Sequence, residues 1–323
     1  MSRIKALQPK LAIVIHTEEE FDWNGGFYRS NNQVTHGSKL ISFCEQLICI
    51  GAKITFALDY AFVCSYDGQK VITHFKQSKF QDNIEFATHC HPWVNPPFEN
   101  NNDKILDIES YPGNLSPELE LQKLQLLTDK ITEVCGVQPT TYLAGRYGIG
   151  KNSNAILKKL GYITDISISP FTNFTHQKGP DFSFNNNDIF KKDGLIHWPH
   201  TTAILSLFSS VETWFNKHPE KFEIMQSKRL TRLLMKLLRI KKQRLSPEGF
   251  ALKDLIKVTN TQLALGKTQL ILSFHSPSTK TALTPYVANE QTSAIFNQKT
   301  IAYVKWFKQL DNASFILVNE STQ

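Results

Sequence analysis

The sequence predicts an α/β protein built on a mostly parallel sheet. Short runs rich in β-branched and aromatic residues alternate with longer segments whose apolar residues recur at helical spacing, and this alternation is typical of β-α-β units. Some runs, such as Leu-Ala-Ile-Val-Ile at residues 11–15, are apolar throughout, as expected for strands buried on both faces. No linker rich in Pro, Gly or Ser divides the 323 residues, so we expect a single domain over residues 1–323.

The predicted elements follow one another in a regular order. Strands are expected at residues 11–15, 52–57, 84–88, 140–144, 163–169, 195–199, 269–274 and 314–318. Helices are expected at residues 37–50, 71–77, 117–135, 152–160, 247–265 and 289–310. Residues 172–192, rich in Asn, Asp, Phe and Gly, predict a long loop over one rim, and such loops are usually lids or binding loops.

Composition excludes several classes of protein. The hydrophobic content of 41% is normal for a globular protein, and no apolar run reaches the 18 residues of a membrane-spanning helix. The five cysteines are odd in number and form no CxxC pair, which argues against a disulfide framework or a zinc ribbon. The run at residues 11–15 is too short for the core of a signal peptide. We therefore expect a cytoplasmic protein with reduced thiols.

A basic amphipathic helical insertion is predicted near residues 226–245. Lysines and arginines recur from Lys228 to Arg244 with no acidic residue among them, and leucines recur there at helical spacing. The interpretation that we favour is a helix that packs its leucines on the body of the protein and keeps a solvated basic face. It could instead lie on an anionic membrane surface, holding the protein at the periphery of the inner membrane. Nucleic acid is not expected, because no aromatic residues that could stack on bases are interleaved.

The stretch His89-Cys90-His91 carries the most information about chemistry. Residues 84–88 predict a strand that runs into a Pro-bounded loop. Residues two apart on a strand point to the same side, so His89 and His91 would present two imidazoles to one point while Cys90 faces away. That arrangement suits Zn²⁺ or another divalent first-row metal. Taken alone, however, such a pair is more often two ordinary polar histidines.

Ionisable side chains gather where the predicted strands end. They are His16 and Glu18 after the first strand, Asp59 after the second, His89 and His91 after the third, Arg146 after the fourth, His200 after the sixth and His275 after the seventh. In a (β/α) barrel these ends share one face, and active sites are built there. The coincidence of Glu18, His89, His91 and His275 therefore predicts a shared site.

Several longer runs show a resemblance to a known family. They are residues 16–23 (HTEEEFDW), 89–98 (HCHPWVNPPF), 110–115 (SYPGNL), 144–148 (AGRYG), 179–183 (GPDFS) and 273–278 (SFHSPS). They resemble the WalW-like branch of the NodB-type polysaccharide deacetylases from about Leu11 to the C-terminal helix. The resemblance implies a distorted (β/α) barrel of about seven parallel strands. It also implies a hydrolase that removes an acetyl group from an N- or O-acetylated sugar or glycoconjugate precursor with one divalent metal ion.

The resemblance also assigns roles to single residues. It implies metal ligation by Glu18, His89 and His91, with Zn²⁺ expected first and Co²⁺, Ni²⁺ or Fe²⁺ as alternatives. His275 is similar to the family's general acid. A backbone N–H near Arg146 or Tyr147 could complete an oxyanion hole. Trp23 and Trp93 beside the site could stack on a sugar face, or they could be packing residues.

Two departures from the family pattern concern one ion pair. The family has an aspartate base where this chain has His16, and an arginine that orients it where this chain has Leu143. A neutral imidazole can accept a proton from water near pH 7, so His16 could be a reassigned base. Alternatively, the barrel retains its metal and binds carbohydrate without turning it over. A third alternative is an amidase on a non-sugar amide, because the fold does not fix the substrate.

Four acidic residues near the expected ligands have simpler interpretations. Glu19, Glu20 and Asp22 lie in the same loop as Glu18, and one of them could be the ligand or the base instead. Their simpler interpretation is a solvated acidic loop, above all for Glu19, which alternation points away from Glu18. Asp59 could be a hydrogen-bond partner of a histidine, but it could equally cap the turn that follows.

Overall fold

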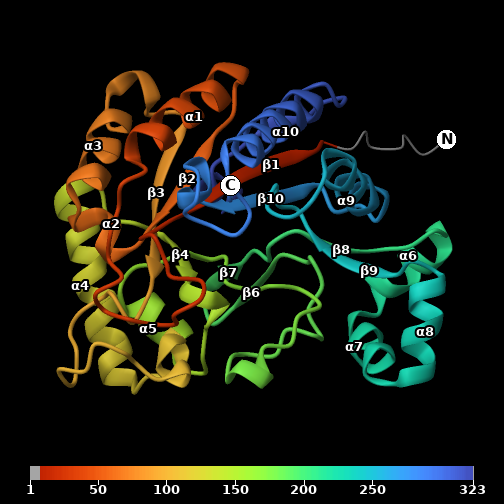
Figure 1. Cartoon of the computed structure of the whole chain (residues 1–323), viewed down its shortest axis with the longest axis horizontal. Helices are drawn as coiled ribbons and strands as arrows, with labels where there is room; N and C mark the ends of the chain where they lie inside the picture. Colours follow the sequence, from red (N-terminus) through yellow and green to blue (C-terminus); the bar gives the residue numbers. More distant parts are fainter. Residues whose placement is uncertain (1–7, 323) are drawn as a thin grey trace.

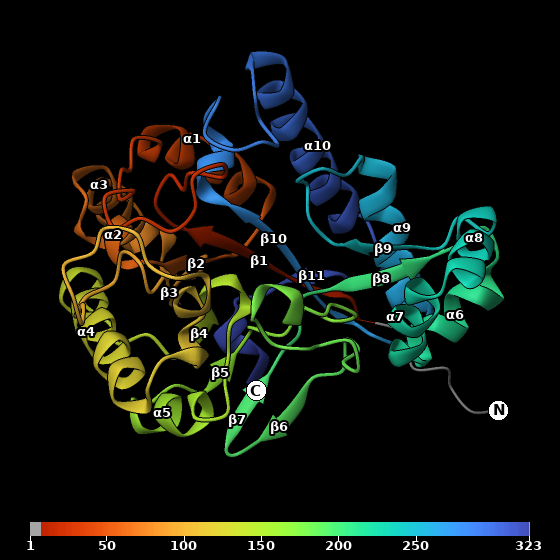
Figure 2. The same ribbon diagram turned by 60° about the horizontal axis from the view of Figure 1, so that its bottom comes forward.

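The computed structural model describes residues 8–322 of the chain. A nine-stranded sheet forms its centre, with the strand order β10-β1-β2-β3-β4-β5-β7-β6 and with β11 paired to β1. The strands are β1 (Lys10–Thr17), β2 (Ile54–Leu58), β3 (Ile84–Cys90), β4 (Thr141–Ala144), β5 (Thr164–Asp165), β6 (Phe190–Lys192), β7 (Leu195–His197), β10 (Gln269–His275) and β11 (Ser314–Phe315). All pairs are parallel except β6 with β7. The sheet curls like part of a barrel (Figure 2), as the sequence predicts.

Helices cover the convex side of the sheet (Figure 1). They are α1 (Gly37–Ile50), α2 (Tyr60–Cys64), α3 (Tyr66–Phe75), α4 (Pro117–Cys135), α5 (Ser153–Lys159), α9 (Leu252–Ala264) and α10 (Glu290–Lys308). The predicted alternation of strands and helices is therefore confirmed. The strand predicted at residues 163–169 is much shorter than expected, because the Asp165 carboxylate accepts hydrogen bonds from the backbone and the hydroxyl of Ser167. The Ser167 hydroxyl in turn accepts from the Ala144 N–H, so a side chain replaces the strand ladder there.

Alternation along β1 separates two cores. Leu11, Ile13 and Ile15 belong to the large cluster between the sheet and the helices. Ala12 and Val14 face the other way, into a small cluster inside the curl that also contains Leu143 and Trp198. Side chains two residues apart share a face, so His16 continues the inner row above Val14. The interior of the sheet is thus apolar below and polar at the C-terminal ends of its strands.

A separate unit projects from the sheet between β7 and α9. It consists of the antiparallel pair β8 (Thr202–Leu205) and β9 (Lys241–Arg244) with the helices α6 (Ser209–Lys217), α7 (Pro219–Ser227) and α8 (Arg229–Leu237), and Figure 1 shows it at the far side from α3. The predicted helix near 226–245 is therefore only partly correct. It ends at Leu237, Arg239 has a positive φ of 50°, and the chain continues as β9.

The leucines of α8 do not pack on the body of the protein, so the interpretation favoured from the sequence is wrong. Leu230 is 81% exposed and Leu237 is 69% exposed, whereas Met235 is buried. The helix is amphipathic, but its neighbours cover only the side of Met235. Within residues 8–322, no helix combines the length and the apolar composition that crossing a bilayer requires.

Candidate functional site

Strand register brings three histidines to one end of the curled sheet. His16 at the end of β1 lies opposite His275 at the end of β10, and His89 near the end of β3 lies opposite Leu143 of β4. The His16 ring centroid is 4.7 Å from that of His275 and 5.1 Å from that of His89. All three side chains follow inner-row positions, so they converge above the small apolar cluster.

The three residues expected to ligate a metal also converge. Glu18 Oε2 lies 3.2 Å from His89 Nε2 and 3.5 Å from His91 Nε2. Ligands that bind one ion tetrahedrally at about 2.0–2.2 Å are separated from one another by about 3.3–3.6 Å. The two distances from Glu18 therefore fit a shared metal ion, and each residue is almost fully buried.

The orientation of His89 and His91 strengthens this fit. His89 Nδ1 lies 3.0 Å from the carbonyl oxygen of Leu143, which can only accept a hydrogen bond. His91 Nδ1 lies 2.8 Å from the carboxylate of Glu19. The His89 ring consequently carries its hydrogen on Nδ1, and the His91 ring does so when Glu19 is ionised, so that in the neutral imidazole Nε2 presents a lone pair. Two such lone pairs face the Glu18 carboxylate, an arrangement that a cation between them would satisfy.

The pKa values of His89, His91 and Glu18 are all lower than usual, through burial or neighbouring charges. Burial lowers the pKa of His89 and of His91. Burial alone would raise the pKa of Glu18, but His275 and the two imidazoles outweigh it and lower that pKa to about 2. Neutral imidazoles beside an ionised carboxylate are the protonation states that metal ligation requires.

Glu19 is not a solvated loop residue, contrary to the expectation from the sequence. It is fully buried, and besides its contact with His91 it accepts a hydrogen bond of 2.7 Å from Trp93 Nε1. Alternation misled the prediction because the chain leaves β1 after Thr17. Burial raises the pKa of Glu19 to about 7, next to the carboxyl of Asp59.

Asp59 fills the capping role considered for it and lies near His91 without a hydrogen bond to that ring. Its Oδ1 accepts from the N–H of Phe62 at 2.6 Å and caps α2. Its Oδ2 lies 3.3 Å from the N–H of Glu19 and 3.8 Å from His91 Nδ1. Glu19, Asp59 and His91 thus form a second group of closely spaced donor atoms. We interpret it as the layer that orients His91, because Nδ1 of that ring faces it.

His16 lies within reach of the same centre. Together with Glu18 and His89 it forms a group whose donor atoms lie within 4.8 Å of one another. Burial lowers the pKa of His16 well below its ordinary value, and the cationic forms of His275 and His89 add to this effect. The geometry therefore permits a neutral His16 to act as a base or as a further metal ligand.

His275 is held by a carboxylate that the sequence did not point out. Glu248 Oε2 accepts from His275 Nδ1 at 2.8 Å, and Glu248 Oε1 accepts from the backbone N–H of the same residue at 3.1 Å. Burial alone would lower the pKa of His275, but the carboxylates of Glu248 and Glu18 raise it to about 9. His275 is therefore protonated near neutral pH. Glu248 lies in an irregular segment after β9, where no periodic pattern indicates a side-chain direction.

The segment after β4 approaches the expected metal ligands closely. A Cβ atom on Gly145 would lie 2.3 Å from the carbonyl oxygen of Cys90 and 2.8 Å from the His91 ring, so only glycine fits. Arg146 and Tyr147 both have positive φ values. The Arg146 guanidinium stacks on Tyr111 and hydrogen-bonds Gln177, so this side chain is engaged at the rim. A backbone N–H of this segment remains the expected oxyanion donor.

The two tryptophans differ in their access to a ligand. Trp23 is 39% exposed, and its ring contacts His275 and Tyr286 at centroid distances of 5.6 and 5.7 Å. Trp93 is 2% exposed and stacks on His91 at 4.2 Å. The position of Trp23 suits stacking on a substrate, whereas Trp93 packs against the His91 imidazole. Tyr147 is also close, with its ring 5.9 Å from that of His16.

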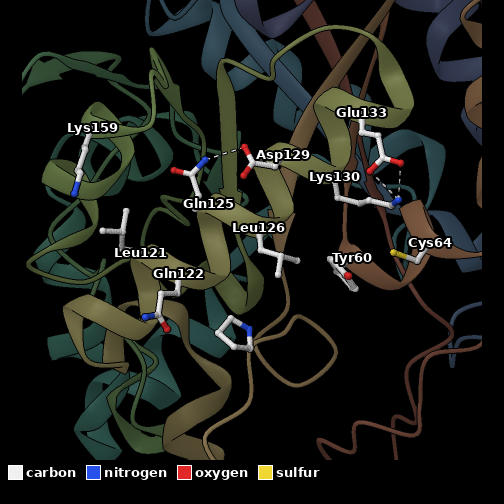
Figure 3. Close-up of a pocket in the computed structure, with 11 residues that line it drawn as sticks. Tyr60, Cys64, Leu121, Gln122, Gln125, Leu126, Asp129, Lys130, Glu133 and Lys159 are labelled. Carbon is white, nitrogen blue, oxygen red and sulfur yellow. Dashed lines mark hydrogen bonds and ion pairs between the residues drawn. The ribbon is translucent and has the colours of Figure 1, made fainter.

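A large groove of about 900 Å³ lies elsewhere, on the outer faces of α2 and α4 (Figure 3). Tyr60, Cys64, Leu126 and the ion pair of Lys130 with Glu133 border it. None of the strand-end residues lines it. Its size therefore does not make it a candidate for the chemistry.

Comparison with solved structures identifies the fold. A probable polysaccharide deacetylase from Pseudomonas aeruginosa PAO1 is similar with a TM-score of 0.51 and 11% identity, over 96% of this chain and 88% of that chain. The chain has a NodB-type deacetylase fold. PuuE allantoinase is similar with a TM-score of 0.50, 10% identity and the same two coverages. No family model and no curated protein matches the sequence.

The same fold is shared with enzymes that act on other substrates. A 4-alpha-glucanotransferase from Thermococcus litoralis is similar with a TM-score of 0.54 and 8% identity, over 98% of this chain but 40% of that chain. These similarities establish the architecture and not the reaction. The WalW-like branch suggested by the sequence stays a prediction.

We expect Glu18→Ala, His89→Ala and His91→Ala each to abolish tight binding of a divalent metal, because each removes one of three anchoring bonds. Glu19→Gln should weaken binding by about 10- to 100-fold, since it disturbs only the partner of His91. Elemental analysis and titration with Zn²⁺ would measure this. His275→Ala is the matched control and should keep the metal. Retention of stoichiometric metal in both histidine ligand variants would refute the assignment.

Proposed function

We propose that the protein is a metal-dependent hydrolase that removes an acetyl group from an N- or O-acetylated sugar or glycoconjugate. The observation that carries the proposal is the convergence of Glu18, His89 and His91, with ligand-like distances from Glu18, near a His275 whose Nδ1 is held by Glu248. The shared fold supports it, because a probable polysaccharide deacetylase has the same architecture.

The mechanism assigns each residue a task at a defined atom. Glu18 Oε2 and the Nε2 atoms of His89 and His91 would hold the ion, which when bound supplies a Lewis acid that polarises the acetyl carbonyl and acidifies water. His275, protonated and fixed by Glu248, would donate its Nε2 hydrogen to the departing sugar nitrogen or oxygen. The backbone after Gly145 would donate an N–H to the oxygen that becomes negative. Trp23 would border the sugar.

His16 has two roles to be distinguished. As a neutral imidazole it would accept a proton from the attacking water, in place of the aspartate of the family. As a fourth protein ligand it would fill the position that water needs, and the protein would then bind carbohydrate without hydrolysing it. Leu143, where the family has an arginine, is buried in the inner cluster and contributes only its backbone carbonyl, which accepts from His89.

An amidase on a non-sugar amide is the main alternative within the same chemistry. PuuE allantoinase shares the fold, and the same donor set would serve such a substrate. The glucan-acting neighbours suggest glycoside hydrolysis, which needs two free carboxyl groups. Glu18 is engaged by two imidazoles and Glu248 by His275, so the site favours acyl hydrolysis.

The function is tested by measuring acetate release from N- and O-acetylated sugars by protein loaded with Zn²⁺, Co²⁺ or Ni²⁺. If His16 is the base, His16→Ala should lower the rate by about 10²- to 10⁴-fold at unchanged metal content. If His16 is a fourth ligand, the native protein should be inactive and His16→Ala should bind metal more weakly. Absence of acetate from both proteins with every metal would sink the proposal.

The activity is expected to depend on pH through His275. A general acid must carry its proton, so activity should fall as pH rises through the His275 pKa of about 9. Glu248→Gln removes the closest anion, which should lower the pKa of His275 and move this decline to lower pH. Profiles of kcat against pH would show the shift. Glu133→Gln is the control, because Glu133 pairs with Lys130 at the surface. An identical decline in wild type and Glu248→Gln would remove His275 from the mechanism.

We also propose that α8 holds the protein at an anionic membrane surface. Its exposed leucines include Leu230 and Leu237, and the cations Arg229, Arg232 and Lys236 lie on the same exposed helix. Apolar side chains beside basic ones are typical of helices that lie in the interface of a bilayer. A substrate attached to a lipid would then be delivered to the site.

Vesicle co-sedimentation tests this surface. Each basic residue near an anionic bilayer contributes on the order of 1 kcal/mol, so we expect binding to phosphatidylserine vesicles and little binding to neutral ones. Leu230→Ser with Leu237→Ser should release the protein, whereas Ile295→Ser on α10, also an exposed apolar residue, should not. Equal sedimentation with neutral and anionic vesicles would rule the surface out.

A further inference from the structure

A second cavity opens directly beside His275. It has a volume of about 290 Å³, and its lining includes Lys242, Arg244, Glu248, His275, Tyr286 and Thr172. It therefore connects the expected general acid to the β8–β9 unit and to the long loop. Arg244 also reaches toward the centre, because its guanidinium donates to the hydroxyl of Tyr147 and lies 4.5 Å over that ring.

The cations of this cavity are delivered by one face of β9. Lys242 and Arg244 are two residues apart, so their side chains point to the same side of the strand. Lys241 and Gln243 alternate with them, and the Lys241 ammonium instead lies 3.2 Å from Asp254 at the surface. The basic run of the sequence is thus divided by the strand into surface charges and cavity charges.

Neither cavity cation forms an ion pair within the described residues. Among residues 8–322, no carboxylate forms an ion pair with Lys242 or Arg244. The Lys242 ammonium donates to the carbonyl of Phe171 at 2.9 Å and to the hydroxyl of Thr172 at 3.0 Å. Arg244 donates to the hydroxyl of Ser169 at 2.8 Å as well as to Tyr147. All these acceptors are uncharged, and both cations are partly buried, which is costly for a charge without an anion.

The acidic residue of the lining does not supply the missing anion. Both oxygens of Glu248 are already taken, by the ring and backbone of His275 and by the hydroxyl of Ser278. Burial accordingly lowers the pKa of Lys242 to about 8. The cavity therefore has an excess of positive charge that its own side chains leave unmatched.

We propose that this cavity binds an anionic group of the substrate, a carboxylate or a phosphate carried by the acetylated sugar. The proposal rests on the proposed hydrolase function, since it places the anion beside His275. Arg244 offers a planar set of N–H donors that suits either oxyanion, and Lys242 adds a point charge. The substrate would thus be an acidic amino sugar or a phosphorylated glycoconjugate, and neutral sugars would bind less tightly.

The test uses metal-free protein, so that the anion cannot bind to a metal instead. Calorimetric titration with D-glucuronate, glucose 6-phosphate and glucose compares a carboxylate, a phosphate and a neutral sugar at one low ionic strength. We expect one of the two anions to bind at least about 10-fold more tightly than glucose, and the preferred anion identifies the source of the charge. Lys242→Gln should weaken that binding by about 10-fold, which corresponds to one hydrogen bond to a charged group.

Matched variants distinguish the effect of the Lys242 charge on binding from its structural role in supporting the loop at Phe171 and Thr172. Lys242→Arg keeps the cation and should retain most of the affinity, whereas Lys241→Gln removes a neighbouring charge from the other face and should change nothing. Arg244→Gln provides a second loss of charge if Lys242→Gln does not fold. Equal affinity of wild-type protein for glucose and for both anions would overturn the proposal, as would an equal loss in Lys241→Gln. The titration measures binding and not turnover, so the anion site can be tested even if the protein proves not to be a hydrolase.

Discussion

The imidazoles of His89 and His91 and the carboxylate of Glu18 are buried close together. The structure around them must hold these polar groups in place. His89 and Glu18 approach to 3.2 Å because each is fixed from behind. The Leu143 carbonyl takes the Nδ1 hydrogen of His89, and the Ser276 hydroxyl accepts from the backbone N–H of Glu18. Such a cluster is costly to bury unless its donors and acceptors are matched. Around His91, the neighbouring residues Glu19, Asp59 and Trp93 provide these partners.

Most of the architecture could be predicted from the pattern of apolar residues. The alternation of strands with helices predicted the parallel sheet. The period of two within a strand placed His89 and His91 on one side, because this periodicity does not depend on distant contacts. Glu19 was misjudged because alternation ceases where β1 ends, and its burial depends on Trp93 and His91, which are distant in sequence. Glu248 was missed for the same reason. It lies in an irregular segment, and only the fold brings it to His275.

For residues 226–245, the sequence pattern predicted a helix but not which of its sides is buried. Leucines at helical spacing predicted a helix, and α8 is one, but spacing does not reveal which side a neighbour covers. Met235 is buried there while the leucines are exposed. The same run of lysines and arginines continues into β9, where a period of two replaces the helical period. Surface charge and cavity charge therefore look alike in the sequence and differ only in the strand that carries them.

The expected metal ligands and the cavity cations come from different parts of the structure, and this separation affects how such a protein can evolve. The expected metal ligands lie near the end of β3 or directly after β1 and β3, whereas Lys242 and Arg244 come from β9. If the cavity beside His275 binds the proposed anionic group, replacement of residues on β9 would change the preference for a ligand while the strand ends of the central sheet stay intact. If the proposed roles hold, a lineage could acquire new substrates by changing β9 alone, without passing through intermediates that have lost the expected metal ligands.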